Sequence, residues 1–178
     1  MSTSANFDAS YYLTNNADVV VAISQGSFAS ALDHYNNFGG RELRQPNANF
    51  DPNYYAINNP DVLNAVSSGA FPSVFAHFQQ FGEVENRAPT SSFAGFDATA
   101  YLAANADVAA AVTAGTVASA LDHFITFGQA EARTGSGVTA PANPGTTTAL
   151  TDSVDSLTGG AGDDTFSATD GTLGAGDS

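Results

Sequence analysis

The chain has 178 residues, of which 18 are acidic and four are basic, so its formal net charge is −14. This charge argues against a nucleic-acid partner, because neutralising phosphates requires Lys or Arg. The lack of Cys excludes disulfides and thiolate metal sites. No apolar run approaches the roughly 18 residues of a membrane-spanning helix, so we expect no transmembrane segment. The first residues also lack the charged start and apolar stretch of a cleaved signal peptide.

One sequence unit recurs three times in residues 1–133, and we predict that these residues form a single all-α domain. The three copies are 7–49, 50–95 and 96–133. Each copy opens with Phe-Asp, continues with Asn-x-Asp-Val and a His-aromatic pair, and closes with Phe-Gly-x-x-Glu-x-Arg. The openings lie 43 and 46 residues apart. So many matches in register indicate tandem helical repeats rather than biased composition.

The apolar spacing inside each copy is helical, with side chains recurring at i, i+3 and i+4. For the second copy we predict three short helices, near 52–57, 60–68 and 71–81. Pro52 and Pro60 each follow a capping residue and fit the first turn of a helix. Pro72 is expected to open the third helix. Gly69 and Gly82 stand where a left-handed helix end favours glycine.

Helices this short are marginal in isolation, so each copy must bury an aromatic face against its own helices and its neighbours. We expect this face to contain Phe75, Phe78 and Phe81 in the second copy, with matching residues in the other two. The small number of copies favours a compact globule over an open solenoid.

A histidine occupies the same position in each copy, at His34, His77 and His123. A shared metal site is disfavoured, because zinc needs ligand nitrogens at about 2 Å whereas packed helices lie about 8–10 Å apart. We instead expect each histidine to be half-buried beside its aromatic neighbour and to bond a local carbonyl or carboxylate.

Each copy also carries the aspartate of Asn-x-Asp-Val and a closing arginine. The aspartates are Asp18, Asp61 and Asp107, and the arginines are Arg44, Arg87 and Arg133. The aspartates fall in a first helical turn, where the helix dipole favours a carboxylate, and we predict that they pair with the arginines within or between copies. Catalysis would require one carboxylate with surroundings unlike the others, which threefold repetition opposes. Because no Gly-x-Ser-x-Gly nucleophile motif is present either, we expect no enzymatic activity.

Tyrosines near the start of each copy are the candidate ligand residues. They are Tyr11, Tyr12, Tyr54, Tyr55 and Tyr101. Adjacent residues on a helix differ by about 100°, so both members of a Tyr-Tyr pair cannot face one core. One of each pair is either exposed, where it can stack on a sugar ring, or packed between copies. The need of short helices for buried area favours packing.

After residue 133 the chain carries six acidic groups and no basic one. Residues 134–150 are small and polar with no apolar period, as in a flexible linker. The segment 151–178 contains Gly-Gly-x-Gly-x-Asp-x-U-x, where U is a large apolar residue, and we expect it to begin a calcium-binding β-roll. The candidate calcium ligands are Gly160, Gly162 and Asp164. Successive turns supply the ligands together, so one turn cannot complete a calcium site and we expect further chain after residue 178.

Two parts of the chain resemble known families. The segment from Leu157 to Phe166 resembles the calcium-binding repeats of RTX proteins, and in particular of RTX-type surface-layer proteins of Gram-negative bacteria. The helical unit is similar to repeats of bacterial extracellular proteins that often lie beside RTX segments. This resemblance implies type I secretion, calcium as a cofactor, and an N-terminal domain that anchors a surface lattice to lipopolysaccharide.

Three functions remain open at this point. The first is a non-catalytic cell-surface anchor that binds the O-antigen or core sugar of lipopolysaccharide outside the outer membrane. The second is a protein–protein assembly module of a secreted RTX adhesin or lattice, with self-association through later parts of the chain. The third is an accessory domain of a secreted enzyme, which a metal or nucleophile motif after residue 178 would favour.

Overall fold

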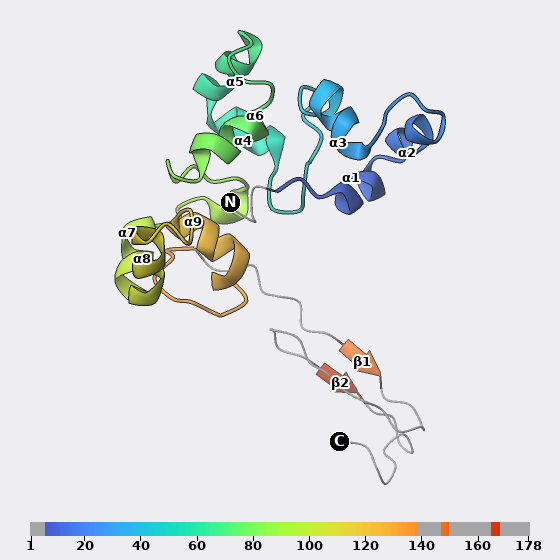
Figure 1. Ribbon diagram of the computed structural model, residues 1–178. Coiled ribbons are helices and arrows are strands. Elements are labelled where there is room, and N and C mark those ends of the chain that lie inside the picture. The colour runs from blue at the N-terminus through green and yellow to red at the C-terminus, as the bar shows by residue number, and fades with distance from the viewer. Residues whose placement is uncertain (1–5, 139–146, 150–164, 168–178) are drawn as a thin grey trace.

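Three helical units follow one another in the computed structural model, which describes residues 6–138, 147–149 and 165–167 (Figure 1). Residues 6–138 contain only helices and loops, so this part of the chain is all-α, as the sequence predicts. The first unit contains α1 (Ala9–Asn15), α2 (Ala17–Ser24), α3 (Ala31–His34) and η1 (Tyr35–Gly39). The second contains α4 (Pro52–Asn58), α5 (Pro60–Ser67), α6 (Val74–His77) and η2 (Phe78–Gly82). After η3 (Ser91–Phe93), the third contains α7 (Ala98–Ala104), α8 (Ala106–Thr113), α9 (Ala120–His123) and η4 (Phe124–Gly128).

Side-chain caps start the first and third helix of every unit. The caps of the first helices are Asp8, Asp51 and Asp97, and those of the third helices are Ser30, Ser73 and Ser119. Each accepts a hydrogen bond from the backbone N–H three residues later, at 2.9–3.1 Å. These bonds satisfy amides that have no carbonyl partner inside the helix. Pro52 and Pro60 occupy the first positions of α4 and α5, as predicted.

The third helix of the second unit begins later than the sequence predicts. Ser73 is its extended N-cap and α6 begins at Val74, so Pro72 precedes the helix instead of opening it. The chain then leaves the α pattern at Phe78 and makes a π turn, η2, that ends at Gly82. The same change occurs at η1 and η4. Turns with i→i+5 hydrogen bonds are rare, and an apolar period of 3.6 residues gives no sign of them.

The π turn changes which aromatic residues are buried. Phe75 and Phe78 are buried, as expected, but Phe81 is 41% exposed. The equivalent Phe38 and Phe127 are 51% and 49% exposed. A π turn contains more residues than an α turn, so the residue three positions after Phe78 is rotated out of the core. The expected burial of Phe81 is therefore wrong.

A backbone hydrogen bond joins the two ends of each unit. The N–H of the capping aspartate donates to a carbonyl just after the closing arginine, at 2.8–3.0 Å. The three bonds run from Asp8 to Pro46, from Asp51 to Pro89, and from Asp97 to Ser136. Each unit therefore returns to its own starting point before the chain enters the next one.

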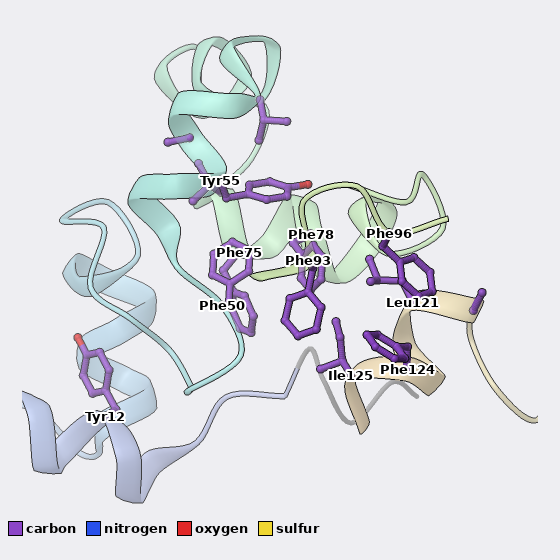
Figure 2. Packing of buried hydrophobic residues seen from close by; sticks show 14 of the residues in the cluster. Tyr12, Phe50, Tyr55, Phe75, Phe78, Phe93, Phe96, Leu121, Phe124 and Ile125 are labelled. Atoms are coloured by element: carbon purple, nitrogen blue, oxygen red, sulfur yellow. The ribbon is translucent and has the colours of Figure 1, made fainter. Parts of the chain in front are cut away.

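Neighbouring units meet through aromatic side chains. Tyr35 of the first unit and Phe75 of the second form a T-shaped pair with ring centroids 6.1 Å apart, and the Tyr35 hydroxyl hydrogen-bonds Ser73. Phe93 in η3 packs edge-on against Phe124 of the third unit at 6.3 Å. Figure 2 shows Phe93 among buried residues of the second and third units. The helices themselves pack mainly within their own unit, while the buried side chains of the three units form one connected hydrophobic cluster.

The start of the predicted linker belongs to the third unit. Ser136 is buried, and Val138 packs against the aromatic core. The side-chain amide of Asn105 also donates to the carbonyl of Thr134 at 3.0 Å. Residues 134–138 of the predicted linker therefore pack on the third unit, and Thr147–Ala149, also within it, form a strand; its other residues lie outside the described part of the chain.

Two short strands are the described part of the tail. They are β1 (Thr147–Ala149) and β2 (Thr165–Ser167), and they pair in parallel with Thr148 opposite Phe166. The other tail residues, including the calcium candidates Gly160, Gly162 and Asp164, lie outside the described residues. Among the helices that the structure describes, none is long and apolar enough to cross a bilayer.

Candidate functional site

A tyrosine and a histidine form a buried pair at the centre of each unit. The pairs are Tyr12–His34, Tyr55–His77 and Tyr101–His123, with hydroxyl-to-Nδ1 distances of 2.9, 3.0 and 2.9 Å. The tyrosines are 0% exposed and the histidines 7–9% exposed. Each histidine is thus more deeply buried than expected, and its partner is a phenol instead of a carbonyl or carboxylate. The pair joins the first helix of a unit to its third.

The glycine of Phe-Gly makes room for the tyrosine hydroxyl. A Cβ added at Gly82 would overlap the hydroxyl oxygen of Tyr55, and a Cβ at Gly39 or Gly128 would overlap the tyrosine of its own unit. Gly69 has a left-handed backbone with a φ of 81°, as predicted, whereas Gly82 does not have a positive φ. The predicted reason for Gly82 is therefore wrong, because that position needs space rather than a special backbone conformation.

Burial sets the protonation state of these pairs. It raises the pKa of Tyr12 and of Tyr101 to about 12, and it also raises the pKa of Tyr55. Burial lowers the pKa of His77, and the charge of Arg87 lowers it further. At neutral pH the second unit therefore contains a neutral phenol bonded to a neutral imidazole, which is a structural contact rather than a charged acid–base pair.

The closing arginine of each unit binds the Asn-x-Asp-Val element, as predicted, and it does so within its own unit. In the second unit Arg87 donates from both Nη atoms to the two carboxylate oxygens of Asp61, each at 2.9 Å. Its Nε donates to Glu85 at 2.6 Å, and Nη1 also donates to Asn59 at 2.9 Å. We call this set the arginine clamp. The other clamps are Arg44 with Asp18, Glu42 and Asn16, and Arg133 with Asp107, Glu131 and Asn105.

The clamp is a surface feature with a strained backbone residue beside it. The hydrogen bond from Arg87 lowers the pKa of Asp61, and the equivalent bonds lower the pKa of Asp18 and Asp107. These aspartate side chains are 61–63% exposed, so water screens the pairs. The residue before each arginine has a positive φ of 51–56° without being glycine: Leu43, Asn86 and Ala132. Three different residue types share this conformation, so the sequence carried no common signal for it.

These contacts account for the polar residues that repeat once per unit. The clamps and the Tyr–His pairs have nearly the same geometry in all three units, so none of the carboxylates and histidines in these two sets differs from its equivalents. Two other carboxylates do not repeat in this way: Glu83 is buried in the second unit only, and Asp122 is buried in the third unit whereas the equivalent Asp33 is half-buried. The three histidines each face their own tyrosine and do not converge. Within the residues that the structure describes, no group of three or more His, Asp or Glu side chains is placed to hold a metal ion.

Exposed aromatic rings are the remaining feature that recurs in every unit. In the second unit Phe71 and Phe81 form a T-shaped pair at 5.9 Å, and both rings contact His77, at 5.1 and 5.7 Å. We call such a cluster an aromatic pad. The first unit has the same pad, made by Phe28, His34 and Phe38, with centroid distances of 4.7–6.0 Å. Its buried histidine therefore supports phenylalanine rings that remain open to a ligand.

The third pad is reduced. His123 and Phe127 keep their contact at 5.7 Å, but Val117 replaces the second phenylalanine. The polar side chains beside the pads differ as well. Exposed amides precede the exposed phenylalanine of the first two units, and they are Asn36, Asn37, Gln79 and Gln80. The third unit has buried Ile125 and half-buried Thr126 at these positions.

The structure divides the five candidate tyrosines into two groups. Tyr12, Tyr55 and Tyr101 are buried within their own units, so their rings have no face open to a ligand. Tyr11 and Tyr54 are half-buried, and the Tyr11 hydroxyl donates to Gln45 at 3.0 Å. Sequence reasoning missed the pads, because it assigned Phe81 and its equivalents to the core and gave Phe28 and Phe71 no role. The available signal was the phenylalanine two residues after the mid-unit glycine, which is Phe28 after Gly26 and Phe71 after Gly69.

Comparison of the chain with protein-family models, with curated proteins and with solved structures finds no match. The resemblance to RTX surface proteins therefore stays a prediction.

Proposed function

We propose that this chain is a non-catalytic module of a bacterial cell surface, whose helical units bind the O-antigen or core sugars of lipopolysaccharide. The aromatic pads carry this proposal. Phe38, Phe81 and Phe127 present half-exposed rings at the same position of three successive units. Equivalent sites that recur along the chain suit a polymer of repeating sugar residues better than they suit a single small molecule.

The chemistry of the second pad fits a neutral sugar. The C–H face of a sugar ring can stack on an aromatic ring, and amide side chains can bond the hydroxyls at its edge. Phe71 and Phe81 provide the rings, and Gln79 and Gln80 provide the neighbouring amides. No charged residue belongs to this set. That matters because the chain has a net charge of −14 and would repel phosphorylated parts of the glycolipid unless calcium bridged them.

The pads also predict which units bind most strongly. The first and second units have two phenylalanines and two exposed amides each, whereas the third has one phenylalanine and no exposed amide at these positions. We therefore assign the main sugar contacts to the first two units.

The tail supports the surface-layer part of the proposal. Thr147 of β1 pairs with Thr165 of β2 in parallel, and these residues are 18 positions apart. This spacing equals two nonapeptides, as a roll built from nonapeptide repeats would give. Under this proposal Gly160, Gly162 and Asp164 contribute to calcium sites together with later turns, and the protein is secreted and held at the outer surface.

Co-sedimentation with outer-membrane vesicles tests the sugar contacts. The full chain should pellet with vesicles that carry lipopolysaccharide, at constant calcium. The double variant Phe38→Leu/Phe81→Leu keeps apolar bulk but removes two rings, and we expect it to bind about tenfold more weakly. Ile57→Leu is the matched control, because Ile57 is 78% exposed and lies outside the pads.

Two results would contradict the proposal. One is equal pelleting of the parent chain with vesicles stripped of O-antigen and core sugars. The other is unchanged binding of the double variant, provided that circular dichroism shows both variants folded as the parent is.

A second function, assembly with other copies, is favoured by one observation. Phe75 of the second unit is buried and packs on Tyr35 of the unit before it. The equivalent Leu32 of the first unit is 46% exposed, as are Val20 at 46% and Val21 at 53%. Size-exclusion chromatography of the parent and of Leu32→Ser tests this alternative, which predicts a concentration-dependent oligomer that the substitution weakens.

A further inference from the structure

One arginine stands apart from the clamps. Arg44, Arg87 and Arg133 are each held by carboxylates of their own unit. Arg41 is exposed and has no ion pair within residues 6–138. Its counterparts in the other units are Val84 and Ala130, so the arrangement that it makes occurs once in the three units.

Arg41 lines a pocket at the junction of the first and second units. The pocket has a volume of about 460 Å³, and its lining includes Leu43 from the first unit and Leu63, Val66, Ser67 and Ser68 from the second. This size suits one or two sugar residues. The lining contains one cation and no carboxylate, in a chain that has 18 acidic residues. Charge therefore favours an anion here, in contrast to the rest of the molecule.

The other lining groups indicate which chemical groups the ligand carries besides its anionic group. The hydroxyls of Ser67 and Ser68 donate to carbonyls of α5, at 2.8 and 3.0 Å, so their oxygens are available to the pocket as acceptors. They lie at the C-terminal end of α5, whose partial negative charge favours a hydrogen-bond donor and opposes an anion, so the anionic group must lie on the Arg41 side of the pocket. Leu63 and Val66 supply an apolar wall. The pocket thus offers an anion contact, acceptors for hydroxyl groups and a surface for C–H groups.

We propose that this pocket binds an acidic sugar residue of the uronic acid class. The planar guanidinium of Arg41 receives the carboxylate in a two-point contact. The sugar hydroxyls donate to the serine oxygens, and the C–H face of the ring lies on Leu63 and Val66. The inference deepens the proposed glycan binding and rests on it, because it places one acidic residue of the glycan beside neutral residues on the aromatic pads.

Side-chain NMR of the full chain provides a direct test. The chain has four arginines and no lysine, so few signals arise from cationic side chains and the Nε–H signal of Arg41 can be assigned by substitution. Glucuronic acid, glucose and acetate are the probes, because the first combines the ring and the carboxylate that the others offer separately. We expect glucuronic acid to shift the Arg41 signal with a Kd of about 1 mM. Glucose and acetate should shift it far less, and the clamp arginines should not respond.

Two variants complete the test. Arg41→Gln should weaken glucuronic acid binding about tenfold or more. Binding to this variant is measured from the backbone amide signals of Ser67 and Ser68. Val84→Gln, at the equivalent position of the second unit, should leave binding unchanged. The proposal is overturned if glucuronic acid leaves Arg41 unshifted, if acetate shifts it as strongly, or if Arg41→Gln binds as the parent does.

This result is separable from that of the vesicle assay. An Arg41 response together with pad variants that still sediment would refute the pads and retain the pocket. Loss of sedimentation in the pad variants with an unresponsive Arg41 would refute the pocket and retain the pads.

Discussion

The first two units and the third share an interior but differ at the surface. All three have the buried Tyr–His pair, the glycine beneath the tyrosine hydroxyl and the arginine clamp, at distances that agree within 0.1 Å for the Tyr–His bond. Only the first two have a second pad phenylalanine and exposed amides next to the pad. Only the first has a cation at the position of Arg41.

This difference separates residues that hold the fold from residues that can bind a ligand. A buried hydroxyl, its histidine and the glycine beside them must change together, because each fills space or satisfies a polar atom for the others. A pad ring or amide on the surface does not fill the unit interior, so it can change without disturbing the Tyr–His pair. The positions that vary between units are therefore better candidates for function than the positions that repeat.

Alkaline pH should have the largest effect, because it acts on the shared interior of all three units. Burial raises the pKa of Tyr12 and Tyr101 to about 12, so the folded state favours the protonated phenol. This contribution is complete below the unfolded pKa of about 10 and is lost as the pH rises toward 12. Helical circular dichroism and phenolate absorbance should change together between these values. Because Tyr11 and Tyr54 are only half-buried, the measurement uses the Tyr11→Phe/Tyr54→Phe variant, in which phenolate formation at pH 10 with the helices intact would contradict the burial.

Replacing the pair of interior glycines is the next largest change. Gly82→Ala and Gly128→Ala each place a methyl group against a tyrosine hydroxyl, and we expect each to cost about 2–3 kcal/mol in urea unfolding. The exposed Ala70→Ser is the control and should stay within about 0.5 kcal/mol. If the two substitutions lowered the free energy of unfolding by clearly different amounts, the interiors of the second and third units would not be equivalent.

Removing the tyrosine hydroxyl should have a smaller effect. Tyr55→Phe and Tyr101→Phe leave a buried histidine nitrogen without its partner, at an expected cost of about 1–2 kcal/mol each. Tyr54→Phe is the matched control, since Tyr54 is half-buried and outside the pair. If Tyr55→Phe behaved like this control, the hydrogen bond to His77 would not contribute to stability.

The clamp should contribute less than the interior, and it sharpens the comparison because one contact of its third copy, from the arginine to the asparagine, is longer, while the bonds to the aspartate are equally short. Arg87 lies 2.9 Å from Asn59 Oδ1, whereas Arg133 lies 3.4 Å from Asn105 Oδ1. We expect Arg87→Gln to lower the urea midpoint by about 0.3 M at pH 6, and Arg133→Gln to lower it less.

The clamp effect also has a defined pH dependence. The pKa of Asp61 is lowered by Arg87, so its contribution is present above the unfolded pKa of about 3.9 and is lost as the pH falls through the folded value. The difference between Arg87→Gln and the parent should therefore shrink below pH 4. A difference that persisted there would assign the effect to lost packing instead of charge.

The surface differences between units should have the smallest effect on stability. Arg41→Gln and Val84→Gln change exposed side chains at equivalent positions, and both should stay within about 0.5 kcal/mol of the parent. A larger cost for Arg41→Gln in urea unfolding would show that this arginine supports the junction between units.

The sequence predicted the contacts between oppositely charged residues, because a carboxylate and a guanidinium pair with few other groups. An aspartate in a first turn and an arginine at the same closing position of every unit have few other choices, so the clamp followed from composition and register. The Tyr–His pair did not, because its members lie 22 residues apart and both residue types can serve many roles. The pads were missed for a geometric reason. Counting apolar positions at 3.6 residues per turn assigned Phe81 to the core, and the π turn at η2 rotates it outward.

The backbone bond from Asp8 to Pro46, with its equivalents in the other units, has a consequence for how such a chain can grow. Because the polypeptide leaves each unit beside the point at which it entered, adding or deleting one unit would shift its neighbours without reopening their interiors. Most contacts are also local within some 40 residues, which favours fast folding of each unit as it emerges. Length can therefore change by whole units, and with it, under the proposed function, the number of sugar residues that one molecule can span.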